Sequence, residues 1–184
     1  MNLRMMIASV LMVGSAAAAT AQERTVMVGG EAMFPSRTIV ANAVNSKDHT
    51  TLVAAVKAAG LVDTLSGAGP FTVFAPTNTA FAKLPAGTVE TLVKPENKAA
   101  LTKILTYHVV PGRIDAEMLM SRIREGRGTA ELKTVGGGTL WAMMNGPRNV
   151  VLKDEKGAVS EIATYDVLQS NGVIHVVTSV LMPK

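Results

Sequence analysis

The chain has 184 residues, no cysteine, and a formal net charge of +4, from 18 lysine and arginine against 14 aspartate and glutamate residues. Without cysteine, disulfide bonds and cysteine-ligated zinc are excluded, so a core and hydrogen bonds must hold the fold. The small positive excess argues against a nucleic-acid partner, because its densest basic group is interrupted by Glu125 and has no aromatic neighbour: Arg122, Arg124 and Arg127.

Residues 1–21 have the pattern of a secretory signal peptide. One basic residue, Arg4, precedes an apolar run from Met5 to Val13, and small residues follow as far as Ala21. The apolar run is shorter than the roughly 20 residues that cross a bilayer. We therefore predict an exported protein, periplasmic or extracellular, with no transmembrane segment after cleavage.

The rest of the chain is predicted to form an arm and one domain. Residues 22–38 mix glycine, methionine and proline without periodicity, which indicates an extended arm. The apolar Met33 and Phe34 should dock this arm on the body. Residues 39–184 contain no internal repeat, low-complexity tract or linker, and their length suits a single domain.

Short helices are predicted after the arm. Ser36 is the expected cap of a first helix that runs to Val44, because serine side chains accept hydrogen bonds from free helical N–H groups. Asp48 or Thr50 should cap a second helix, which ends at Gly60. The segment LVDTLSG adds one more turn.

The stretch GPFTVFAPTNTAF predicts a strand, a turn and a helix. Phe71 to Phe74 form a short β-prone run between two prolines, and Pro76 cannot continue a sheet ladder. Thr77 or Asn78 is then placed to cap a helix, on which Phe81 points back at the strand.

Pro95 is expected to open a longer helix. Its apolar face is defined by four side chains at helical spacing: Leu101, Ile104, Leu105 and His108. The β-prone run from Tyr107 to Val110 predicts that this helix gives way to a strand, and Asp115 should cap a further helix.

The last third of the chain is strand-rich. Its β-prone runs are separated by GGG, NGPRN, DEKG and QSNG, which are turn-forming sequences that predict antiparallel hairpins. The runs cover residues 131–135, 140–144, 149–153, 159–164 and 173–177. The last of them, VIHVV, is apolar on both faces and should be a central strand. With the early strand at Phe71 joining this sheet, the predicted fold class is α+β, with a helical first half and a strand-rich second half.

The residues themselves indicate no catalytic, metal or cofactor site. No nucleotide-binding, nucleophile-elbow or zinc-protease motif occurs. The closest carboxylate pairs, Asp115 with Glu117 and Asp154 with Glu155, fit helix capping and a solvated hairpin loop. No two of the three histidines have the spacing of metal ligands: His49, His108 and His175. We expect His108 and His175 to be neutral, hydrogen-bonded core residues, with a binding or catalytic role as the alternative.

Three stretches together resemble the fasciclin domain. They are FTVFAPTNTAF from Phe71 to Phe81, the Tyr107-His108 pair, and NGVIHVVTSVLMP from Asn171 to Pro183, and the resemblance spans the chain from about Ile39 onward. The residues that match the family motifs are Phe71, Phe74, Pro76, Thr77, Asn78, Phe81, Tyr107, His108, Asn171, Gly172 and His175.

The resemblance implies a wedge of two β-sheets flanked by helices, and adhesion at the cell envelope or extracellular matrix without catalysis. The arm resembles that of single-domain secreted bacterial members. In animal members the Tyr-His region has been proposed to bind integrins, which would name Tyr107 and His108. Because the helical pattern places His108 inward, we interpret the whole motif set as structural first.

Two functional hypotheses follow. The first is a non-enzymatic exported adhesion or surface-interaction module whose partner is an envelope or matrix protein or polysaccharide. The alternative is a periplasmic small-ligand or glycan-binding protein, with its site between the arm and the helices.

Overall fold

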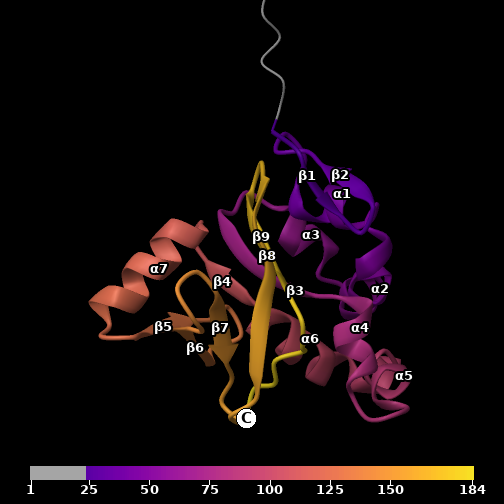
Figure 1. The fold of residues 1–184 in the computed structure, drawn as a ribbon. Helices are drawn as coiled ribbons and strands as arrows, with labels where there is room; N and C mark the ends of the chain where they lie inside the picture. Colours follow the sequence, from indigo (N-terminus) through magenta and orange to yellow (C-terminus); the bar gives the residue numbers. More distant parts are fainter. Residues whose placement is uncertain (1–23) are drawn as a thin grey trace, which may run out of the picture.

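A computed structural model describes residues 24–184, and the expected signal peptide lies outside this part of the chain. Its centre is a seven-stranded sheet with the strand order β4-β3-β9-β8-β7-β6-β5 (Figure 1). The strands are β3 (Phe71–Pro76), β4 (Val109–Pro111), β5 (Thr129–Lys133), β6 (Thr139–Met144), β7 (Val150–Lys153), β8 (Val159–Gln169) and β9 (Gly172–Val177).

In residues 24–184 every helix precedes the last five strands, so the predicted α+β class, helical first and strand-rich second, is confirmed. The α-helices are α1 (Ile39–Ala43), α2 (Thr50–Ala59), α3 (Val62–Ser66), α4 (Asn78–Ala82), α5 (Thr88–Leu92), α6 (Lys98–Tyr107) and α7 (Ala116–Glu125), and the 3-10 turns are η1 (Lys47–His49) and η2 (Pro95–Asn97). Within residues 24–184, every helix is too short or too polar to cross a membrane.

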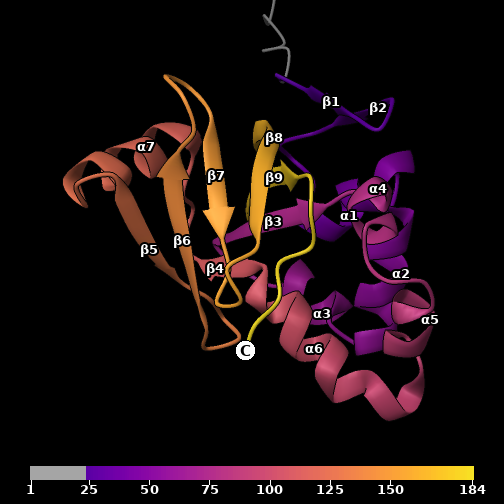
Figure 2. The same cartoon turned by 60° about the horizontal axis from the view of Figure 1, so that its bottom comes forward.

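The implied two sheets are two halves of one hydrogen-bonded sheet that share β8. The start of β8 pairs with β7, and its later part pairs with β9 after register shifts between Ile162 and Val167. In Figure 2, β5, β6 and β7 consequently run in a different direction from β3. The sequence placed the end of β8 at Thr164, five residues too early, because its irregular middle breaks the two-residue alternation.

The late strands form the predicted antiparallel hairpins. The early strand β3 also joins them as predicted, but it pairs in parallel with β9, with Phe74 opposite His175. All six residues of β9 are buried, so its prediction as a central strand is confirmed. The sequence places β5 two residues too late, at 131–135. The strand runs from Thr129 to Lys133, and Val135 belongs to the following turn.

The sheet separates two apolar clusters. On one face, Val73 and Ala75 of β3 and Ile174 of β9 pack with the helices before α7. On the other face, Phe74 and Val177 pack with α7 and with the inner side of β5, β6 and β7. The alternation of these residues along each strand is the two-residue period of a sheet, so neighbouring residues serve opposite clusters.

The arm, which was expected to be extended, is a β-hairpin. β1 (Val26–Val28) and β2 (Glu31–Met33) pair across Gly29 and Gly30, both of which have positive φ. The predicted docking through Met33 and Phe34 is confirmed: Met33 is 3% exposed, and the backbone of half-buried Phe34 exchanges two hydrogen bonds with the Asn42 side chain.

Two of the expected helix caps are wrong. Thr38, not Ser36, caps α1 by accepting a hydrogen bond from the Ala41 N–H at 3.3 Å. Neither Asp48 nor Thr50 caps α2. Its first turn is served by Asn78, whose Oδ1 accepts from the Thr51 N–H at 3.0 Å and whose Nδ2 donates to the Lys47 carbonyl at 2.8 Å.

Local signals were sufficient for the other helix ends. Thr77 caps α4, Asp115 caps α7, and Gly60 ends α2 in the left-handed conformation with φ of +72°. Pro95 opens the short 3-10 turn that leads into α6.

Candidate functional site

The motif residues gather around the junction of β3, β9 and the end of α6. Most are buried, with exposed fractions of 0% for Phe74 and His175, 1% for Tyr107 and 3% for His108. Phe71 and the caps Thr77 and Asn78 are half-buried. Their side chains therefore face the interior and each other more than they face solvent.

His108 connects the end of α6 to the C-terminal segment. Its Nδ1–H donates to the Ile104 carbonyl at 2.9 Å, and its Nε2 accepts from the Leu181 N–H at 3.0 Å. A carbonyl can only accept and a backbone N–H can only donate, so these partners fix the tautomer. Burial lowers the pKa of His108 to about 4, despite the opposing Ile104 carbonyl and Asp154 charge. The ring is therefore neutral at pH 7 and uses both nitrogens.

Tyr107 points into the opposite cluster. Its hydroxyl donates to the Thr139 carbonyl at 2.7 Å and accepts from the Glu155 N–H at 3.1 Å. Burial raises the pKa of Tyr107 to about 12. Gly138 lies against the ring, where a Cβ would stand 2.5 Å from Cε2, so part of the GGG sequence is required by this close contact. The Tyr-His pair spans the sheet, and both rings are buried.

His175 has the same kind of environment on β9. Its Nε2–H donates to the Ile114 carbonyl at 2.8 Å, and its Nδ1 accepts from the Asp166 N–H at 3.3 Å. The ring stacks on Phe74 with centroids 5.7 Å apart. Burial is the main cause that lowers the pKa of His175.

Asn171 joins the sheet to two helices. Its Oδ1 accepts from the Ile39 N–H at 3.0 Å, and its Nδ2 donates to the carbonyls of Leu65 and Gly67. Next to it, Gly172 lies so close to the Phe71 carbonyl that a Cβ would stand 2.1 Å from the oxygen. These contacts account for the Asn-Gly sequence of the last motif.

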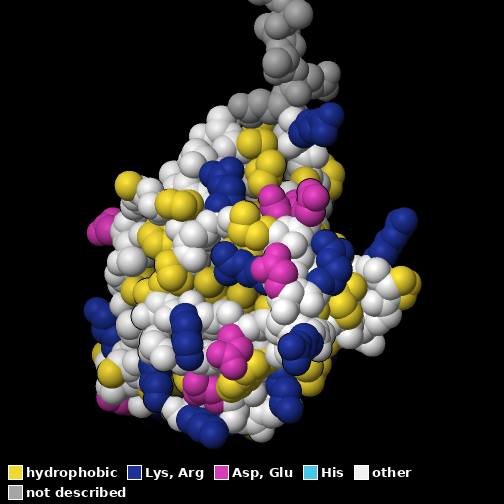
Figure 3. All heavy atoms as spheres, turned by 90° about the vertical axis from the view of Figure 1, so that its left-hand side faces the viewer, with side chains coloured by type: hydrophobic (Ala, Val, Ile, Leu, Met, Phe, Trp, Pro, Cys, Tyr) yellow, Lys and Arg dark blue, Asp and Glu magenta, His cyan; other side chains and the backbone are white. Residues whose placement is uncertain are grey.

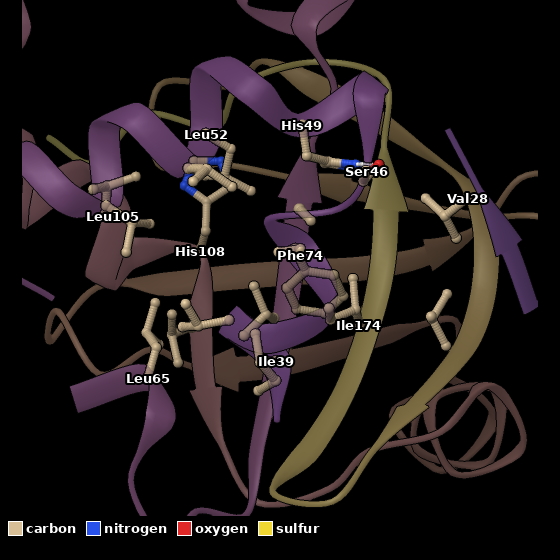
Figure 4. A pocket seen from close by; sticks show the side chains of 18 of the residues that line it. Val28, Ile39, Ser46, His49, Leu52, Leu65, Phe74, Leu105, His108 and Ile174 are labelled. Carbon is tan, nitrogen blue, oxygen red and sulfur yellow. Dashed lines mark hydrogen bonds between the residues drawn. The ribbon is translucent and has the colours of Figure 1, made fainter. Parts of the chain in front are cut away.

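A cavity of about 60 Å³ lies between the arm, the helices α1 to α3 and the sheet (Figure 4). Its wall is mainly apolar and contains two of the motif residues, Phe74 and His108. Apolar side chains from the arm, four helices and four strands of the large sheet complete it, among them Val28, Ile39, Leu52, Leu65, Val73 and Ile174.

His49 also lies in this wall, and it differs from His108 and His175 in its hydrogen bonds. It is 3% exposed, and its Nδ1 lies 2.8 Å from the Ser46 hydroxyl (Figure 4). Among residues 24–184, its Nε2 is the one buried side-chain nitrogen or oxygen without a hydrogen bond. Burial lowers the pKa of His49, and the Ala75 carbonyl and the Asp48 charge only partly oppose this effect. His49 lies outside every motif and apolar stripe, so no sequence pattern predicts its place in the cavity wall.

A second hollow lies on the outer face of β5, β6 and β7. It is an open depression of about 530 Å³ that includes Trp141 and Met143 of β6 and the loop from Asp154 to Gly157. Trp141 is half-buried and has Glu131 and Lys153 as its cross-strand neighbours on the same face. The only tryptophan of the chain thus lies between two charged side chains.

Charged groups are dispersed on the side of the molecule where α7 lies (Figure 3). Figure 3 shows lysine and arginine side chains interspersed with acidic and hydrophobic ones on the side where α7 lies. Within residues 24–184, no group of three histidine or acidic residues could hold a metal ion.

The profile of the Fasciclin domain matches residues 47–183, three quarters of the chain. The chain belongs to the fasciclin family. A fasciclin relative, protein sll1483 of Synechocystis sp., is 47% identical over 88% of this chain and 82% of its own length. The immunogenic protein MPB70 of Mycobacterium bovis is 35% identical over 77% of this chain and 66% of its own.

The fold agrees with this assignment. The structure of a FAS1 domain pair from the insect cell adhesion molecule fasciclin I covers 81% of this chain and 52% of that chain, with a TM-score of 0.71 and 19% identity. At this identity the likeness concerns the fold alone. Among the residues that resemble the family motifs, His108, His175 and Asn171 join helices, sheet and C-terminal segment through the hydrogen bonds described above.

Proposed function

We propose that this fasciclin protein is an exported, non-enzymatic surface-interaction module that acts at the cell envelope or in the extracellular matrix. The observation that carries this proposal is the contrast between its interior and its outer sheet face. Inside, the titratable motif groups Tyr107, His108 and His175 are buried and held in hydrogen bonds to the backbone. Outside, an aromatic ring and charged groups share one open depression.

The interior groups are poorly suited to acid–base catalysis. A general base needs a free lone pair within reach of a substrate, and its pKa should lie near the working pH. His108 has a pKa of about 4 and Tyr107 one of about 12, and both use their polar atoms within the protein. The relative fasciclin I is described as a cell adhesion molecule, which also favours binding over catalysis.

The outer depression suits a polysaccharide. Sugar rings present C–H groups that pack on an aromatic face and hydroxyl groups that bond to charged and polar neighbours. Trp141 supplies the aromatic surface, while the exposed side chains Lys153 and Lys156 supply donors at its border. We propose this face as the binding site, with an envelope or matrix polysaccharide as the partner.

Co-sedimentation of the mature protein with insoluble envelope and matrix polysaccharide tests the proposal. Trp141→Thr should weaken binding about tenfold, since aromatic residues at the centre of a contact contribute most of its energy. Val135→Thr is the matched control, because Val135 is 46% exposed but lies in the turn after β5. Binding only to proteinaceous fractions, or equal binding by both variants, would contradict the assignment.

The second candidate is a periplasmic small-ligand protein, and the cavity between the arm and the helices favours it. That cavity is mainly apolar and too small for a sugar ring, so a glycan fits the outer face better. A ligand at one hundred times its dissociation constant should raise the free energy of unfolding by about 2.7 kcal/mol, which a thermal-shift screen detects.

A further inference from the structure

We propose that the cavity between the arm and helices α1 to α3 binds a small uncharged alcohol, with its alkyl part against the apolar wall and its hydroxyl on Nε2 of His49. This inference rests on the small-ligand candidate function and is independent of the outer face around Trp141. It names a site, a chemical class of ligand and the atom that recognises it.

The wall sets the apolar part of the ligand. The cavity is bordered by Ile39 of α1, Leu52 of α2 and Ile174 of β9, and each of these side chains is less than a tenth exposed. An engineered cavity of about 150 Å³ with a similar wall holds benzene. At about 60 Å³, this cavity suits an alkyl group of only a few carbon atoms.

His49 sets the polar part. A buried nitrogen without a partner costs free energy, which a ligand that bonds to it recovers. The Ser46 contact at Nδ1 is compatible with either tautomer, so Nε2 is either a donor or an acceptor, and the nearby Ala75 carbonyl is the acceptor with which a ligand competes for a ring N–H. A hydroxyl can donate and accept, and it therefore pairs with both forms.

The charges argue for an uncharged ligand. Burial keeps His49 neutral, and the one other ionisable group in the wall besides His108 is Lys57, an exposed residue at the border of the cavity. A carboxylate or ammonium group inside would have no counter-ion, and burying an unpaired charge is far more costly than burying a hydroxyl.

The border of the cavity offers a route for entry. Val40 and Ala43 of α1, Val53 of α2 and Val62 of α3 line it and are only half-buried. A larger side chain at Ala43 should fill this space. Ala41 lies on the same helix but is exposed, which makes it a matched control position.

The test is an NMR titration of the mature protein with 1-propanol and with 1-chloropropane, a probe of similar size without a hydroxyl. We expect 1-propanol to produce saturable shifts at the methyl groups of Ile39, Leu52 and Ile174, and 1-chloropropane to bind about three- to tenfold more weakly, the range for one neutral hydrogen bond. Saturation by neither probe, or equal affinity for both, would overturn the proposal.

Variants test separately whether the probes occupy this cavity and whether Nε2 of His49 bonds to the hydroxyl. Ala43→Leu should abolish binding of both probes, while Ala41→Leu should bind as the parent does. His49→Asn keeps a polar group beside Ser46 and removes Nε2, so the preference for 1-propanol should disappear. Unchanged binding by Ala43→Leu would place the probes elsewhere and overturn the site. A failure here leaves the sedimentation result with Trp141→Thr unaffected, so the two proposals fail separately.

Discussion

His108 and His49 are equally buried, at 3% exposure each, and both border the same cavity, yet they differ in what their nitrogens do. His108 uses both nitrogens to join α6 to the C-terminal segment. His49 uses one, with Ser46, and leaves Nε2 without a partner in the described chain. The difference teaches that the motif residue His108 holds the fold together, while the unpaired polar atom belongs to His49, outside the motif residues.

The largest expected effect comes from replacing each ring by an apolar side chain. His108→Leu leaves the buried Leu181 N–H and Ile104 carbonyl unpaired, so we expect a loss of about 3 kcal/mol in the free energy of unfolding. His49→Leu breaks only the Ser46 bond at Nδ1, because Nε2 is already unpaired, and it should cost about 1 to 2 kcal/mol. Urea denaturation measures both, and equal losses would remove the contrast.

The lowered pKa of His108 should make the stability of the protein depend on pH. Its pKa is near 4 in the folded protein and 6.5 ordinarily, so below pH 6.5 the unfolded chain binds a proton that the folded chain does not. Stability is therefore full above pH 6.5 and falls progressively toward pH 4, by roughly 2 to 3 kcal/mol. His108→Leu should make this part of the stability curve less steep without abolishing the slope, because burial also lowers the pKa values of His49 and His175. A parent curve already flat from pH 6.5 to 4 would contradict the assignment.

Tyr107→Phe gives an intermediate effect on the other side of the sheet. The change removes the hydroxyl that joins the Thr139 carbonyl to the Glu155 N–H, and it leaves the ring against Gly138. We expect a loss of about 1 to 2 kcal/mol, measured by thermal or urea unfolding. Tyr165→Phe is the control, because that hydroxyl makes only one bond, to the Val150 N–H, and its loss should be smaller.

The smallest effect is expected at the caps. Asn78→Ala removes the group that serves the first turn of α2 from a different helix, and Thr77→Ala removes the ordinary cap of α4. Each should cost about 1 kcal/mol. Hydrogen exchange distinguishes them: Asn78→Ala should raise exchange at Thr51, and Thr77→Ala at Ala80. Increased exchange at Ala80 alone in both variants would show that α2 needs no cap from Asn78.

The sequence predicted the features that depend on neighbouring residues. The strand at Phe71, the cap at Asp115 and the end of α2 at Gly60 follow from local chemistry, and the structure has each of them. Asn78 could not be assigned correctly in this way, because its partners lie 27 and 31 residues away. The parallel pairing of β3 with β9 is likewise set by contacts across half the chain.

The candidate sites show the same division. Periodicity placed His108 in the interior, as the structure does, because it continues the apolar stripe of α6. His49 lies in the η1 turn before α2, where no periodic pattern applies, and the cavity that it lines is completed by helices and strands far along the chain. Trp141 lies in the β-prone run that predicts β6. Only the pairing of β5, β6 and β7 shows which charged side chains flank it.

The most direct test of this contrast is a long-range ¹H–¹⁵N spectrum of the histidine rings, recorded at pH 7 with and without 1-propanol. The account predicts that the Nε2 signal of His49 moves most on addition of the alcohol, that the signals of His108 in the same wall move less, and that those of His175 keep their positions. Equal movement of all three rings, or no movement of His49, would contradict the claim that His49 alone offers a free nitrogen to a ligand.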